Sequence, residues 1–297
     1  MRIGAFEMRE PLPHLKEPHV IAILRPWVNV GRVGTLTMSR LERHFATKQL
    51  GQLAMPGDFF DFTRYRPRSR LVRDRREMRI PNSVLSYVER EEAPDLLLFN
   101  LREPHAAGED YVQSIVDVLK ALDVRRYCLI GGMYDVVPHT RPLLVSGSAG
   151  GPGGADLAKS LNIEESGYQG PTSITAIITQ EALKLGIDYM TLVVHLPQYV
   201  QLDEDYAGAA RLMEVLCSMY GLPPRLVDED RGKRQYNELN LAMDRNPELK
   251  AILSQLEAQY DRRHKPTEEP LPPLAPEVER FLREVGSGDR AQDDEDS

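Results

Sequence analysis

Short apolar runs, each paired with a segment of helical spacing, recur along this 297-residue chain and restrict its fold more than any other feature. The runs are Val20–Leu24, Asp95–Leu101, Tyr127–Gly132 and Met190–His195. The segments with helical spacing are 33–45, Tyr111–Leu122 and Pro171–Leu185. Alternation of buried strands with amphipathic helices is typical of a layered α/β fold whose crossovers are right-handed. We therefore predict an α/β domain with a central, mostly parallel sheet.

The remaining sequence suggests four parts. Residues 1–18 form an N-terminal arm, 19–224 the α/β core domain and 225–262 a helical C-terminal addition. A helix is expected over Asp203–Tyr220, and another over Gln235–Asp261 with a break at Asn246-Pro247. Residues 263–297 combine a proline-rich linker with an acidic tail, a composition that is typical of flexible segments.

Composition limits the class of partner. The formal net charge of −8 argues against a nucleic-acid binder, because counterion release rewards basic surfaces. The arginine-rich segment Arg64–Arg79 is interleaved with acidic residues, and we interpret it as a half-exposed strand or a subunit interface. No apolar stretch is long enough to predict a membrane span, and the two cysteines form no disulfide framework. A cytoplasmic protein is the expectation.

Polar side chains follow three of the predicted strands, where the carboxyl ends of parallel strands commonly bind ligands. The candidate rim consists of Glu103, Asp135, His139, Thr140, Arg141, His195 and Tyr199. A histidine beside a carboxylate could transfer protons, and an arginine could hold an anion. The same residues could instead form structural ion pairs. No catalytic residue is assigned, and the scattered histidines and cysteines predict neither a metal site nor a cofactor.

Five segments, taken together, resemble the bacterial branch of the proteasome assembly chaperone 2 family. They are Val137–Pro142 (Val-Pro-His-Thr-Arg-Pro), His195–Val200, Phe60–Pro67, Arg102-Glu103-Pro104 and Leu256–Asp261. The hexapeptide is the specific element, and the others are individually modest. The resemblance implies a three-layer α/β/α fold of the phosphorylase/hydrolase-like type with a helical C-terminal addition. It also implies self-association, with a trimer as the expected assembly, and says little about activity.

Two functions remain open on this basis. The first is an oligomeric, non-catalytic chaperone-like or assembly factor that binds a protein partner. A helix carrying Val278, Phe281, Leu282 and Val285 on its proline-rich tether is the candidate docking element. The alternative is an enzyme or binding protein for a small anionic ligand, such as a nucleoside, nucleotide or phosphorylated metabolite, held by the rim. We favour the first, because the sequence contains neither a nucleophile elbow nor a phosphate-binding loop.

Overall fold

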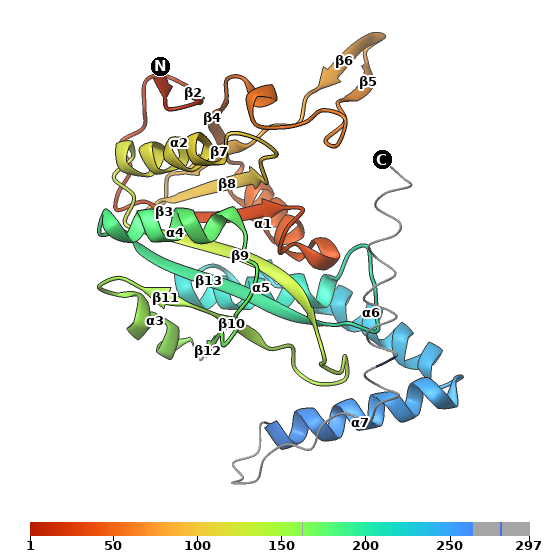
Figure 1. The fold of residues 1–297 in the computed structure, drawn as a ribbon. Helices are drawn as coiled ribbons and strands as arrows, with labels where there is room; N and C mark the ends of the chain where they lie inside the picture. Colours follow the sequence, from red (N-terminus) through yellow and green to blue (C-terminus); the bar gives the residue numbers. More distant parts are fainter. Residues whose placement is uncertain (162, 264–279, 281–297) are drawn as a thin grey trace. The chain divides into compact units, whose positions relative to one another are not determined.

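A computed structural model describes residues 1–161, 163–263 and 280 of the chain. These residues fall into two compact units, and the chain passes between them several times. Figure 1 labels the helices and strands along the chain. Unit 1 contains Met1–Asn29, Met38–Gly131 and Ser146–Leu192. Unit 2 contains Val30–Thr37, Gly132–Val145 and the chain from Val193 onward. Each unit is described separately below.

Unit 1 is built on an 11-stranded sheet formed by the described residues. Its strand order is β1 (Arg2–Ile3), β2 (Phe6–Met8), β4 (Lys48–Leu53), β7 (Val84–Val88), β8 (Leu96–Arg102), β3 (His19–Arg25), β9 (Arg126–Asp135), β13 (Asp188–Pro197), β10 (Val145–Gly147) and β12 (Glu164–Glu165), and β11 (Ala149–Gly150) pairs with β13. Strands β9 and β13 begin in unit 1 and continue into unit 2.

The centre of the sheet is parallel, as the apolar runs predict. Strand β3 pairs in parallel with β8 on one side and β9 on the other. Strands β1, β2, β4 and β7 extend the sheet beyond β8 through antiparallel pairings. These four strands were not predicted from the sequence. The sheet is therefore mixed, with a parallel centre buried on both faces.

Helices cover both faces of this sheet within unit 1. Helices α2 (Gly108–Ala121) and α4 (Ile174–Lys184) pack on each other and on the face that carries Val20, Ala22 and Phe99. The opposite face is covered by the Met38–Phe45 part of α1 (Val33–Phe45), where Glu42 accepts a hydrogen bond of 2.8 Å from Asn100. The predicted α/β class and three layers are confirmed.

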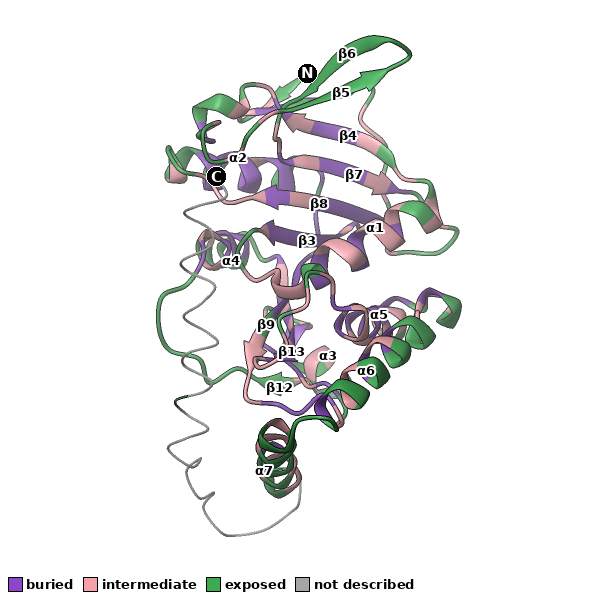
Figure 2. Cartoon of the chain, turned by 90° about the vertical axis from the view of Figure 1, so that its right-hand side faces the viewer, coloured by how far each residue is buried: buried purple, intermediate pink, exposed green. Residues whose placement is uncertain are grey.

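The arginine-rich segment forms a β-hairpin rather than the single half-exposed strand that we expected. Strands β5 (Arg68–Val72) and β6 (Arg75–Arg79) pair only with each other, and all ten residues are exposed (Figure 2). Arg73 and Asp74 form the turn, and both have positive φ, as two-residue hairpin loops require. An exposed strand was expected here, but its division by a turn was not, because the alternation of side chains continues across the turn in the sequence. The alternative of a subunit interface stays a prediction.

Unit 2 contains the C-terminal helices. These are α5 (Tyr206–Tyr220), α6 (Glu229–Met243) and α7 (Pro247–Arg263), and the single-turn helices η1 (Val30–Arg32) and η3 (Pro224–Leu226) also belong to this unit. Helices α6 and α7 meet at the predicted Asn246-Pro247 break. The remaining short elements, α3 (Gly154–Ser160) and η2 (Pro56–Asp58), belong to unit 1. The described residues therefore confirm the helical C-terminal part.

Candidate functional site in unit 2

His139 lies in the loop after β9 and is 5% exposed. Its Nδ1 is 2.6 Å from the Tyr199 hydroxyl, which also accepts a 2.9 Å hydrogen bond from the His139 backbone N–H. Its Nε2 is 2.9 Å from Oδ1 of Asn240 on α6. Because an amide oxygen only accepts, this contact favours the tautomer with the proton on Nε2. Burial lowers the pKa of His139, so the ring is neutral at pH 7.

The next two residues hold helix α7. Arg141 makes a two-pronged contact with Asp261, with Nε–Oδ1 at 2.8 Å and Nη2–Oδ2 at 2.9 Å. Its Nη1 lies 3.1 Å from Oε1 of Glu257, which also accepts a hydrogen bond from the Thr140 hydroxyl. The hydrogen bonds to Asp261 hold the pKa of Arg141 above its usual value. Glu257 and Asp261 are four residues apart, so one helix face presents both carboxylates.

Replacement of Arg141 by Gln should loosen α7 without unfolding the protein. A two-pronged arginine–carboxylate contact is stronger than an ordinary surface ion pair, and its loss should raise amide hydrogen exchange in 247–263 about tenfold. Hydrogen-exchange mass spectrometry measures this directly. Lys250→Gln is the matched control, because it removes an exposed surface ion pair with Asp244. Equal exchange in both variants would show that Arg141 does not anchor the helix.

Asp135 and His195 form the second polar contact of the rim. His195 Nδ1 is 2.6 Å from Asp135 Oδ2, and Asp135 Oδ1 accepts a 2.7 Å hydrogen bond from the Val136 N–H. Burial acts to raise the pKa of Asp135, but the hydrogen bonds from His195 and Val136 outweigh it and leave that pKa below its usual value. An ionised carboxylate that orients an imidazole is the arrangement used by general bases. This pair can accept a proton from a bound water or hydroxyl.

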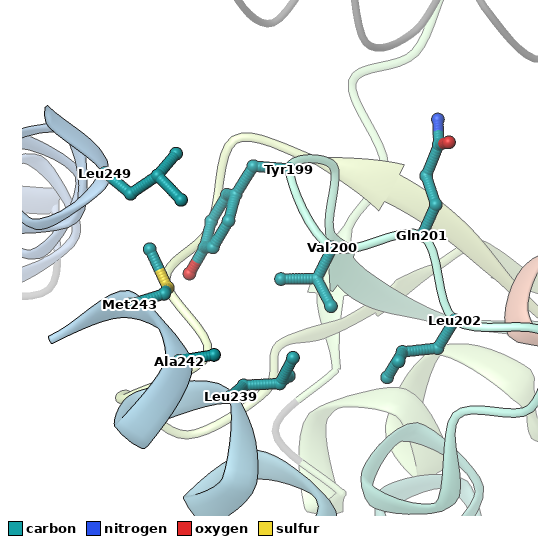
Figure 3. A pocket seen from close by; sticks show the side chains of 8 residues that line it. All are labelled: Tyr199, Val200, Gln201, Leu202, Leu239, Ala242, Met243 and Leu249. Carbon is teal, nitrogen blue, oxygen red and sulfur yellow. The ribbon is translucent and has the colours of Figure 1, made fainter. Parts of the chain in front are cut away.

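An apolar pocket of about 320 Å³ lies beside Tyr199 of the rim (Figure 3). It is formed by the segment after β13 and by helices α6 and α7. Its lining residues are Tyr199, Val200, Gln201, Leu202, Leu239, Ala242, Met243 and Leu249. The Tyr199 ring forms one wall, while the Tyr199 hydroxyl is engaged by His139. The helical segment that carries Leu239, Met243 and Leu249 was predicted from the sequence, but the pocket was not.

Comparison with known proteins identifies the family of this chain. The model of the PAC2 family matches residues 23–229, which is more than half of the chain. The chain belongs to the PAC2 family. No curated protein matches it in sequence.

Solved structures share the PAC2 fold with this chain. A PAC2 family protein from Streptomyces avermitilis is 24% identical, with a TM-score of 0.70, and the match covers 80% of this chain and 99% of that one. A proteasome-assembly chaperone homologue from Mycobacterium tuberculosis is 21% identical, with a TM-score of 0.69 and coverages of 79% and 99%. PbaB from Pyrococcus furiosus, described as an archaeal proteasome activator, is 15% identical, with a TM-score of 0.61 and coverages of 80% and 97%.

Six of the seven predicted rim residues of this PAC2 protein lie in unit 2, and Glu103 lies in unit 1. The Glu103 backbone N–H donates to Arg25 O at 2.9 Å, its carbonyl accepts from the Tyr65 hydroxyl, and burial raises the pKa of its carboxyl group. Arg141 therefore pairs with carboxylates of α7 and not with Glu103. Asn240, Glu257 and Asp261 were not predicted as partners of the rim. Glu257 and Asp261 were a visible signal, because they are two carboxylates four residues apart in a segment that carries the family resemblance.

The remaining predictions concern docking, metals and membranes. Val278, Phe281, Leu282 and Val285 lie outside the described residues. Within the described ranges, no cluster of three or more His, Cys, Asp or Glu side chains is arranged to hold a metal ion. Across the same residues, no helix is both long and apolar enough to cross a membrane.

Proposed function

We propose that this PAC2 protein is a non-catalytic, chaperone-like assembly factor that binds a protein partner through the apolar pocket of unit 2. The partner would be a subunit of a larger complex, with the proteasome as the model suggested by the names of the M. tuberculosis and P. furiosus proteins. We also propose that it acts in the cytoplasm as a homo-oligomer, with a trimer as the expected form. Membership of the PAC2 family supports these proposals.

The contrast between the polar rim and the pocket carries the proposal. His139 bonds to Asn240 of α6 through Nε2 and to Tyr199 through Nδ1, and the guanidinium of Arg141 bonds to two carboxylates of α7. These groups therefore hold the helices instead of facing a substrate. The pocket offers apolar side chains such as Leu239 and Leu249 around about 320 Å³ of space. A space of this size accepts one or two apolar side chains of a partner helix or extended segment.

A photo-reactive amino acid at position 239 tests this proposal. Leu239 lines the pocket, whereas Leu241 on the same helix is 63% exposed and does not line it, so position 241 is the matched control. Cross-linking in cells should give an adduct at 239 that is absent at 241. The partner is then purified, and its dissociation constant is measured with wild type, Leu239→Glu and Leu241→Glu.

We expect Leu239→Glu to weaken binding of that purified partner at least about tenfold, because a carboxylate would be buried without a partner. Leu241→Glu should stay within about twofold of wild type. Circular dichroism checks that both variants are folded. Identical adducts at the two positions, or equal affinities of the two variants, would contradict a role for the pocket.

The Asp135–His195 pair favours a second candidate, a site for a small anionic ligand such as a nucleotide or a phosphorylated metabolite. Its 2.6 Å contact orients an imidazole whose side chain is 12% exposed. A thermal-shift panel of nucleosides, nucleotides and sugar phosphates distinguishes the two functions. Saturating ligand stabilises a protein by about 2.7 kcal/mol at 100 times its dissociation constant. A shift that His195→Asn removes would support this candidate, and a flat panel would support the assembly factor.

A further inference from the structure

Two arginines end neighbouring strands of unit 1 side by side. Arg25 is the last residue of β3, Arg102 is the last residue of β8, and the two are register partners in a parallel pair. Strands β3 and β8 lie next to each other in the sheet (Figures 1 and 2). Partner residues on parallel strands lie roughly 4.8 Å apart and project to the same face. The two arginine side chains therefore start next to each other at the carboxyl end of the sheet. This end is where α/β proteins commonly bind ligands.

The backbones of both arginines are fixed. The Arg102 N–H donates to the Ser83 hydroxyl at 2.9 Å, and its carbonyl accepts from the Tyr111 hydroxyl at 2.9 Å. The Arg25 carbonyl accepts from Glu103 N–H at 2.9 Å and from the Tyr65 hydroxyl at 3.2 Å. The Tyr65 ring also lies 5.0 Å from the Arg102 guanidinium carbon. The side chains thus start from a rigid base, which reduces the entropy lost on binding.

The Nε donors of the two guanidinium groups lack acceptors. The Nε atoms of Arg25 and Arg102 are buried and have no hydrogen-bond partner among the described residues. Within the same part of the chain, neither side chain forms an ion pair. A buried donor without an acceptor is costly, and a guanidinium fork matches the oxygens of an oxyanion. These donors are arranged for an acceptor that the folded chain does not supply.

The surroundings are strongly positive. Burial, together with the charges of Arg102 and Arg79, lowers the pKa of Arg25 to about 10, and Glu42 is the carboxylate that acts in the opposite direction. Burial likewise lowers the pKa of Arg102, with Arg79 and Arg68 contributing. Arg68 and Arg79 are register partners at the base of the exposed hairpin. Four guanidinium groups therefore contribute positive charge at this position, and among the described residues Glu42 is the one carboxylate that opposes them. Glu42 already accepts a hydrogen bond from Asn100.

We propose that Arg25 and Arg102, together with Arg68 and Arg79 of the hairpin, form a binding site for a di- or triphosphate group. A single carboxylate would neutralise only one of the excess charges. Each phosphate group brings roughly −1.5 to −2 charges and several strong acceptor oxygens, so two or three linked phosphates match four arginines. All four arginines belong to unit 1, whereas the residues that line the apolar pocket belong to unit 2.

Isothermal titration of the full-length chain with inorganic tripolyphosphate and pyrophosphate, at low and at physiological salt, tests the proposal. We expect wild type to bind tripolyphosphate more tightly than pyrophosphate, with affinity falling as salt rises. The double variant Arg25→Gln/Arg102→Gln should lose at least about a hundredfold in affinity, because two charged hydrogen-bonding groups are removed. Arg79→Gln is exposed and safe for folding, and it should lose about tenfold.

Arg73→Gln is the matched control, because it makes the same charge change at the hairpin turn and Arg73 does not act on either strand-end arginine. It should bind within about twofold of wild type. Absence of tripolyphosphate binding to wild type at low salt would overturn the proposal. So would an equal loss in Arg73→Gln and Arg79→Gln, which would mark a diffuse basic surface. Tighter binding of a hexaglutamate peptide than of tripolyphosphate would assign the arginines to an acidic protein segment instead.

Discussion

Replacement of Asp205 by Ala should lower the free energy of unfolding by about 3 kcal/mol, because this side chain joins two helices of unit 2. Asp205 is 2% exposed and is the N-cap of α5, where its Oδ1 accepts a 2.7 Å hydrogen bond from the Gly208 N–H. Its Oδ2 accepts a 2.9 Å hydrogen bond from the Tyr236 hydroxyl of α6. The alanine variant loses the cap and leaves a buried hydroxyl without an acceptor.

Asp205→Asn separates the hydrogen bonds from the charge. The amide has the same shape and can accept from Gly208, so we expect it to stay within about 1 kcal/mol of wild type at pH 7. Burial raises the pKa of Asp205 in the folded state, so the folded chain binds this proton more tightly than the unfolded chain. The stability from this group is therefore greatest below the usual carboxyl pKa and declines as pH rises through the folded value.

Urea unfolding at several pH values measures both effects. Asp205→Asn should lack the part of the pH dependence that comes from this carboxyl group. The exposed neighbour Asp203, replaced by Ala, should unfold like wild type to within about 0.5 kcal/mol. If Asp205→Ala and Asp203→Ala unfolded at the same urea concentration, the Asp205 contacts would carry no stability.

Gly131→Ala should destabilise unit 1 by more than about 3 kcal/mol and reduce the soluble yield. An added Cβ on this residue of β9 would lie 2.1 Å from the Val28 carbonyl oxygen and 2.9 Å from the Val28 Cγ1. The obstructing oxygen belongs to the backbone, so no side-chain rotation can remove the overlap. Val28 itself has φ of 56°, which leaves this stretch of backbone little freedom to retreat.

Thermal unfolding followed by circular dichroism measures this loss. Gly167→Ala is the control, because a Cβ there meets no atom within 4 Å. It should melt at the wild-type temperature or slightly above, since alanine reduces the freedom of the unfolded chain. A Gly131→Ala protein that melts with the Gly167→Ala control would disprove the close approach of Val28 to β9.

The strands of this PAC2 fold could be predicted where apolar residues are continuous. Val20–Leu24 and Asp95–Leu101 are buried on both faces in β3 and β8, so hydrophobicity alone marks them. Strands β4 and β7 mix buried and partly exposed residues, and their patterns are weak. The hairpin was missed because alternation does not reveal a turn, and Arg73-Asp74 carries no glycine to mark one.

The contacts of the candidate site could be predicted only in part. The hexapeptide around His139 was a visible motif, but its partners are separated from it by long stretches of sequence. Asn240 lies 101 residues after His139, and Asp261 lies 120 residues after Arg141. Local patterns carry no information about such pairs. The Arg25–Arg102 pair had a usable signal, because each arginine is the first charged residue after the apolar run of its strand, but the pairing requires the register.

The two units are interleaved along the chain, and this limits which segments can be exchanged between PAC2 proteins during evolution. Unit 2 draws on three separate segments, and its C-terminal helices take the anchoring side chains His139 and Arg141 from a loop that follows β9. A graft of residues 193–297 alone onto a homologue would leave these anchors behind. Productive chimaeras must transfer the hexapeptide loop and the helices together, so the two segments are expected to be inherited as one set.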